Sequence, residues 1–99
     1  MSAIKSTLAP DVLAVAVTFG ANIKEARIAR GWRQYDMAQR MLVSVPTLQA
    51  IEAGKVTVSL ENYLRALDVL NMAEQIAAVA SPHTDEEGRR LKSFGRVRI

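Results

Sequence analysis

The stretch from Gly31 to Lys55 most constrains the fold of this 99-residue chain, because it places two short helix patterns only a few residues apart. The first pattern runs from Gln34 to Met41 and has its apolar side chains on one face. The second begins after Ser44, a favourable N-cap residue, and ends at Gly54. Helices this short bury their apolar faces against each other, so the stretch predicts a rigid pair of crossing helices.

The connection and the start of the second helix are compatible with this arrangement. Leu42 and Val43 form a short connection, and Ala38 is small enough for a close helix crossing. Pro46 is the second residue after the Ser44 cap, where a helix leaves its N–H groups unpaired, so we expect no kink. A second helix exposed as a rigid rod in this way suits insertion into the major groove of DNA.

The residues before this pair also contain helix patterns. Residues 12–19 fit either a helix that starts at Pro10 or a strand, and we expect Gly20 to end the run. A helix over 21–30 follows from the spacing of its apolar residues, and Gly31 ends it.

Two more helices are predicted after the pair. Ser59 caps a helix over 60–70, whose leucines recur at helical spacing, and Asn71 suits its left-handed C-cap. A fifth helix over 72–80 is expected to bury Ile76 and Val79 and to stop at Ser81-Pro82.

Five short helices with brief connections predict an all-α fold. We expect an N-terminal segment over 1–19, a helical domain over 20–80, and a charged C-terminal tail over 81–99. The tail is either flexible until it meets a partner or forms a short strand around 94–99.

Composition excludes several classes of protein. The chain has no cysteine, so disulfide scaffolds, thiol nucleophiles and cysteine-rich zinc sites are excluded. No apolar run resembles a secretion signal or a membrane span, so we expect a soluble, cytoplasmic protein. Acidic residues are scattered and no Ser-His-Asp arrangement is evident, so we expect no enzyme and no cofactor. His83 stands alone in an acidic run, so we interpret it as a solvated residue and not as a metal ligand.

The charge distribution suits a polyanion partner. The net charge is +3 and the pI is about 9.7, and basic residues concentrate in the middle of the chain and in the last eleven residues. Nucleic acid is the usual partner for such a distribution, although a solvated basic surface explains the charge alone equally well.

One known family resembles this sequence. The run GWRQYDMAQRMLVSVPTLQAIEAGK is similar to the Cro/repressor-type (Xre) helix-turn-helix, whose usual form is G-L-T-Q-x-x-L-A-x-x-x-G-V-S-x-x-T-I-x-x-I-E-x-G-K. The similarity continues through VSLENYLRALDVLNM and covers about residues 20–80. It implies a five-helix, lambda-repressor-like DNA-binding domain. The chain departs from the family at Val45, where many relatives have Arg or Gln, and at Leu42, where Gly is frequent. Leu42 is therefore either strained or part of a different turn.

The resemblance also implies which residues meet the bases of DNA. The expected positions are Val45, Pro46, Thr47, Gln49 and Ala50, at the start of the second helix of the pair. Val45 or Pro46 would contact thymine methyl groups, and Thr47 would bond a phosphate or a base. Of these, only Gln49 can make the bidentate contact that favours adenine.

Other residues are expected to contact phosphates or to hold the helices together. Gln34 opens a helix whose N-terminus attracts phosphate, and Lys55 supplies a point charge. Each of these two is alternatively an ordinary helix-start or surface residue. Arg33, Arg40 and Ser44 are further phosphate candidates. In this family an arginine at the position of Arg27 pairs with the glutamate at Glu52, which implies a structural ion pair.

The function expected from this resemblance is sequence-specific repression by a homodimer that binds double-stranded operator DNA. The segment from residue 46 to 91 is also similar to small Xre antitoxins encoded beside HipA-type kinase toxins, through VSL-x-x-Y-x-x-x-L and the D-x-x-G at Asp85–Gly88. That likeness implies an antitoxin that regulates its own operon and neutralises a HipA-like kinase. The alternatives are a free-standing phage-type regulator and a protein-interaction module with little DNA binding.

Overall fold

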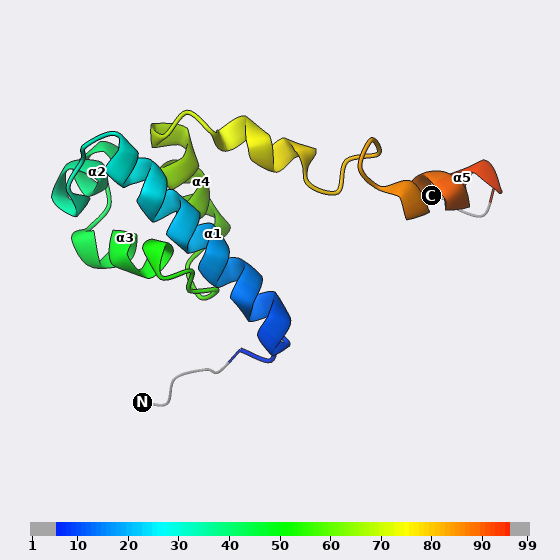
Figure 1. Ribbon diagram of the computed structural model, residues 1–99, viewed down its shortest axis with the longest axis horizontal. Helices are drawn as coiled ribbons and strands as arrows, with labels where there is room; N and C mark the ends of the chain where they lie inside the picture. Colours follow the sequence, from blue (N-terminus) through cyan, green and yellow to red (C-terminus); the bar gives the residue numbers. More distant parts are fainter. Residues whose placement is uncertain (1–5, 96–99) are drawn as a thin grey trace.

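The computed structural model describes residues 6–95, and over this range it contains helices and no strand. The helices are α1 (Pro10–Ala29), α2 (Gln34–Met41), α3 (Val45–Glu52), α4 (Leu60–Val69), the 3₁₀ helix η1 (Ala73–Ala78) and α5 (Glu86–Ser93). The predicted all-α class is confirmed. α3 packs against α1 and α2, α4 packs against α2, and η1 packs against α4 (Figure 1).

The core lies between α1, α2, α3 and α4. Met37, Leu48 and Ile51 are completely shielded from solvent, and Ile23 and Leu70 are 2% and 1% exposed. The same spacing of apolar residues that predicted α2 and α3 therefore marks the faces by which they pack. The bounds of α2 agree with the prediction, and α3 begins after Ser44 and ends before Gly54 as expected.

The prediction that Gly20 ends a separate N-terminal run is wrong, as is the strand alternative for residues 12–19. α1 begins at Pro10 and continues through Gly20 to Ala29, so the boundary expected after residue 19 falls inside a helix. A Cβ on Gly20 would lie 2.5 Å from the carbonyl oxygen of Ile51 and 2.8 Å from that of Glu52. Glycine is present because α1 crosses the end of α3 at backbone contact.

Gly54, which follows α3, also allows the backbones of α1 and α3 to approach closely. Its φ of +72° is in the left-handed region, and a Cβ there would collide with the carbonyl group of Ala16 in α1. Phe19 of α1 also stacks on Tyr63 of α4, with 5.4 Å between ring centroids. These contacts fix the angle at which α1 lies across α3.

The second half of the domain agrees with the sequence in part. Ser59 caps α4 by accepting a hydrogen bond from the Asn62 N–H at 3.1 Å, and Asn71 has the expected left-handed backbone, with φ +62°. The fifth predicted helix is the 3₁₀ helix η1, which ends at Ala78, before Ser81-Pro82. Ile76 packs against the core, but Val79 is 70% exposed because the backbone is already extended there.

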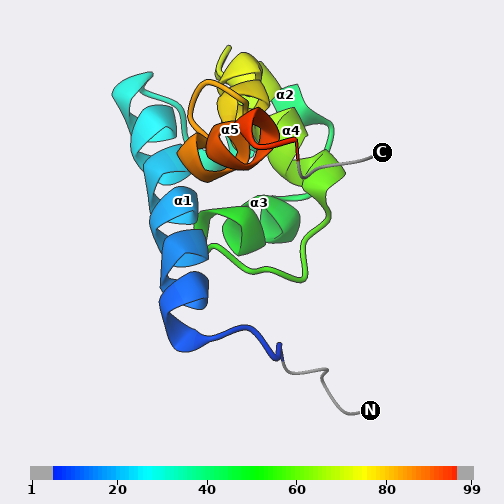
Figure 2. The same ribbon diagram turned by 90° about the vertical axis from the view of Figure 1, so that its right-hand side faces the viewer.

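The C-terminal segment forms a helix that projects from the domain. Asp85 caps α5 by accepting from the Gly88 N–H at 2.8 Å. The expected strand around 94–99 does not begin at Phe94 and Gly95, which close α5, and its remaining residues lie outside the described range. Figure 1 shows α5 at the end of an arm away from the other helices, and in Figure 2, which looks along this arm, α5 lies in front of the domain. The Cα radius of gyration is 16.8 Å, whereas a compact chain of this length has about 13 Å.

Among the described residues, no helix combines the length and the apolar character that a membrane crossing requires.

Candidate nucleic-acid interface

The turn between α2 and α3 keeps a left-handed backbone at Leu42. Its φ and ψ are 61° and 40°, and the next N–H, of Val43, donates to the carbonyl of Ala38 at 3.0 Å. The Leu42 side chain is 84% exposed. Leu42, where relatives often have glycine, was expected to be either strained or part of a different turn. The structure shows the strained alternative, because leucine occupies a left-handed conformation that glycine favours.

The start of α3 is held by a side-chain cap. The Ser44 Oγ accepts from the Thr47 N–H at 3.2 Å, and the two hydroxyl groups lie 3.0 Å apart. Pro46 occupies the first turn of α3 without interrupting the helix. Ser44 and Thr47, expected at phosphates and bases, therefore also have a structural role in the cap.

The two faces of α3 differ sharply in burial. Leu48 and Ile51 are fully buried, whereas Pro46 and Gln49 are exposed. The other three predicted base contacts, Val45, Thr47 and Ala50, are half-buried. An outer face of α3 that is open to solvent, held by a cap and by a buried opposite face, is the geometry that reading a DNA groove requires.

A hydrogen-bonded network connects α1 to the outer face of α3. Arg27 and Glu52, predicted as an ion pair, lie together, with 2.6 Å between Nε and Oε2 and side-chain exposures of 9% and 4%. Arg27 Nη1 also donates to the carbonyl of Trp32 at 2.8 Å. Gln34 Nε2 donates to Glu52 Oε1 at 3.0 Å, and Gln49 Nε2 donates to Gln34 Oε1 at 3.2 Å. Gln34 and Gln49, each predicted separately to contact DNA, also contact each other, which no pattern in the sequence indicated.

Arg33 is held at the start of α2. Its guanidinium lies 3.0 Å from the Asp36 carboxylate, which also accepts from the Arg33 backbone N–H at 2.9 Å. The hydrogen bond from the Arg33 side chain is the main cause that lowers the pKa of Asp36, and the same bond raises the pKa of Arg33. The side chain of Arg33 is 78% exposed, so its outer face is accessible to a phosphate.

Arg40 and Lys55, the remaining predicted phosphate contacts that carry a positive charge, are both exposed. The Arg40 guanidinium lies 4.3 Å from the centre of the Trp32 ring, a cation–π contact. Lys55 is exposed just after α3, and its backbone carbonyl accepts the Tyr63 hydroxyl at 2.6 Å. Burial raises the pKa of Tyr63, which keeps this hydroxyl a donor. Tyr63 thereby fixes the backbone that carries Lys55.

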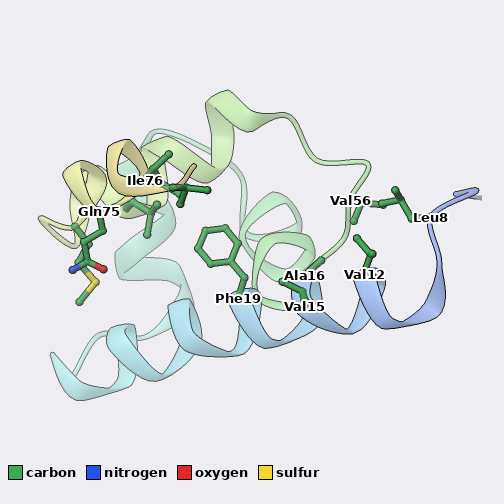
Figure 3. Close-up of a pocket in the computed structure, with 11 residues that line it drawn as sticks. Leu8, Val12, Val15, Ala16, Phe19, Val56, Gln75 and Ile76 are labelled. Carbon is green, nitrogen blue, oxygen red and sulfur yellow. The ribbon is translucent and has the colours of Figure 1, made fainter. Parts of the chain in front are cut away.

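An apolar groove lies on a different part of the surface, and Figure 3 shows it. Side chains from the first half of α1, from Val56 and from η1 line a volume of about 500 Å³, with Val12, Val15, Phe19 and Ile76 among them. Several of these residues are substantially exposed, including Val12 at 48% and Val15 at 68%.

Residues 6–95 contain no cluster of three or more His, Cys, Asp or Glu side chains arranged to hold a metal ion.

Comparison with protein families identifies the fold unit that contains α2 and α3. A family model described as Helix-turn-helix matches residues 23–75, more than half of the chain. The matched region starts within α1, contains α2, α3 and α4, and ends in η1. Neither the curated proteins nor the solved structures give a match.

Proposed function

We propose that this chain, which belongs to the Cro/C1-type helix-turn-helix family of DNA-binding transcriptional regulators, is a sequence-specific repressor. We further propose that it acts as a homodimer. Domains of this family are typically not enzymes. The observation that carries the proposal is the outer face of α3, which exposes Pro46 and Gln49 while the opposite face packs against α1 and α2. A repressor of this kind excludes other proteins from an operator by occupying its major groove.

For the bases, we propose contacts by the residues at the start of α3. Gln49 is exposed and is the residue among them with both a donor and an acceptor on one planar group, so it is assigned to adenine. Pro46 is exposed and apolar, which suits a thymine methyl group. Val45, Thr47 and Ala50 are assigned to further base contacts beside those of Pro46 and Gln49.

For the phosphates, we propose contacts on both sides of α3. Lys55 and Arg33 are exposed cations, and Arg40 offers the outer face of its guanidinium beside Trp32. The backbone N–H groups at the start of α2, where Gln34 stands, and the hydroxyl group of the Ser44 cap supply uncharged donors. These contacts set the orientation of the domain, while sequence is read by α3.

The antitoxin role belongs to the same proposal. The likeness of the later segment to antitoxins paired with HipA-type kinases supports it, as does the projecting arm that ends in α5, which offers surface to a protein partner. We therefore propose that the protein represses its own operon and neutralises a HipA-like kinase. The neighbouring reading frame tests this directly, because the absence of a kinase-like gene would leave a free-standing regulator.

The test of DNA binding is a mobility shift with DNA from upstream of the protein's own gene. We expect the wild-type chain to select one near-palindromic site with half-sites about 34 Å apart. Gln49→Ala should lose this selectivity. Gln39→Ala is the matched control, since Gln39 is exposed on α2 and bonds only Tyr35.

The competing function is a protein-interaction module with little DNA binding. The small number of polar side chains on α3 favours it. Sequence selectivity separates the two, because neutralisation of phosphates, which adds a slope of about −0.9 per phosphate to the log–log plot of affinity against salt, supplies nearly all of non-specific binding. Weak binding that is indifferent to Gln49 and disappears with salt would support the interaction module.

A further inference from the structure

Four side chains form a continuous hydrogen-bonded path from the interior of the domain to the proposed reading surface. Arg27 of α1 contacts Glu52 of α3, Glu52 accepts from Gln34 of α2, and Gln34 accepts from Gln49 on the outer face of α3. The path begins at a pair that is nearly excluded from solvent and ends at an exposed amide. Burial therefore decreases along the path toward the surface.

The chemistry of the buried end determines the direction of every bond. A guanidinium can only donate, and the ionised carboxylate that it pairs with can only accept. Gln34 must therefore turn its NH₂ group toward Glu52, as its 3.0 Å contact requires. Its carbonyl oxygen then faces Gln49, and only the NH₂ group of Gln49 can meet that oxygen, at 3.2 Å.

This direction leaves a defined pattern on the outside of Gln49. One N–H of the amide is engaged by Gln34, which leaves its other N–H and its carbonyl oxygen for a partner. Adenine presents N7 as an acceptor and N6–H₂ as a donor along one edge, so an amide of fixed orientation matches it in one order. Reversing the base pair reverses the order of the acceptor and the donor, and guanine offers two acceptors.

We propose that Gln34 and Glu52 are positioning residues that set the base preference of Gln49. They hold its amide in the orientation that favours an A·T pair over T·A and G·C at one position of the half-site. This inference rests on the proposed function, because it concerns the base contact of that same site. It differs from a role for Gln34 at phosphate, which would affect all sequences equally.

The test uses the full-length chain and Gln34→Met, which is similar in length to the wild-type residue but cannot form either hydrogen bond. A pool of double-stranded DNA randomised over about 20 base pairs first gives the preferred site. Affinities are then measured for that site with each base pair replaced in turn. Gln39→Met is the matched control, because Gln39 is also on α2 but its side chain donates to the hydroxyl group of Tyr35 and not to the path.

We expect one position at which the wild type prefers A·T by about fivefold or more. Gln49→Ala should remove this preference, and Gln34→Met should reduce it by about fivefold at the same position only. The double variant should lose no more preference than Gln49→Ala alone. The side-chain amide NMR signal of Gln49 in the DNA-free protein should shift in Gln34→Met but not in Gln39→Met.

Three outcomes would overturn the inference. If Gln34→Met keeps the wild-type preference, the amide of Gln49 is oriented without it, and the repressor function is unaffected. If Gln34→Met weakens binding to every sequence equally, Gln34 contacts phosphate and does not position Gln49. If the wild type selects no sequence at all, the proposed function fails and the positioning role fails with it.

Discussion

Arg27 and Glu52 show how much a single pair of residues contributes to this small domain. Both side chains are nearly excluded from solvent, so removing one leaves the other charge unmatched in the interior. We expect Arg27→Met to lower the free energy of unfolding by about 3–5 kcal/mol, measured by urea denaturation.

The matched control for this substitution is Arg65→Met. Arg65 pairs with Glu61 on the surface of α4, with side-chain exposures of 43% and 74%. Pairs of this kind contribute less than about 1 kcal/mol. Equal losses in the two variants would show that burial of the Arg27–Glu52 pair has no energetic consequence.

Leu42 carries a conformational cost that glycine would remove. Its backbone is left-handed and its side chain is 84% exposed, so a substitution to glycine relieves strain and loses little packing. The greater freedom of glycine in the unfolded chain offsets part of this gain. We expect Leu42→Gly to raise the free energy of unfolding by up to about 1 kcal/mol. A lower midpoint in thermal unfolding would contradict this expectation.

At the scale of helices, the crossing of α1 over α3 depends on one missing side chain. In the middle of an exposed helix, alanine in place of glycine is normally stabilising by about 0.5–1 kcal/mol. At Gly20 the added methyl group would meet the carbonyl oxygens of Ile51 and Glu52. We therefore expect Gly20→Ala to be destabilising by about 3 kcal/mol.

The sign of the change in the free energy of unfolding on Gly20→Ala tests the close approach of α1 and α3. Ala21 is the next residue of α1 and is exposed, so Ala21→Gly should cost only about 1 kcal/mol, the helix propensity difference. Circular dichroism during chemical denaturation measures both variants. A gain in stability for Gly20→Ala would mean that α1 and α3 lie farther apart than the structure shows.

At the scale of the whole molecule, the first half of α1 presents an exposed apolar surface that the proposed DNA contacts do not use. It is apolar on several faces, and its groove-lining residues Val12 and Val15 are exposed. Asp11 is the one charged residue between 10 and 19, so charge repulsion does not oppose the approach of a second copy. Because the proposed repressor needs two copies, we expect this surface to form the homodimer contact.

A charge placed in the groove tests this contact. We expect Val15→Glu to convert the dimer to a monomer in light-scattering measurements, while Val17→Glu does not. Val17 is the matched control, because it is also exposed on α1 but does not line the groove. A chain truncated after Ser81 should remain dimeric. Loss of the dimer on truncation would assign the contact to the arm that carries α5.

The sequence by itself determined the helices whose signals are local. The serine caps at Ser44 and Ser59, the stop at Gly54 and the apolar spacing of α2 were sufficient because each acts within one or two helical turns. Together with the brief connections they predicted the all-α fold, and the resemblance over about residues 20–80 added the Arg27–Glu52 pair.

Only the tertiary structure decided how distant residues are used. Gly20 was predicted to end a helix, because nothing near it in the chain indicates that the end of α3 lies against it. Gln34 bonds partners 15 and 18 residues away, far beyond the one or two helical turns over which caps and apolar spacing act. The exposure of Val79 and the projection of α5 depend on where η1 ends. In each case the deciding interaction joins segments that only packing brings together.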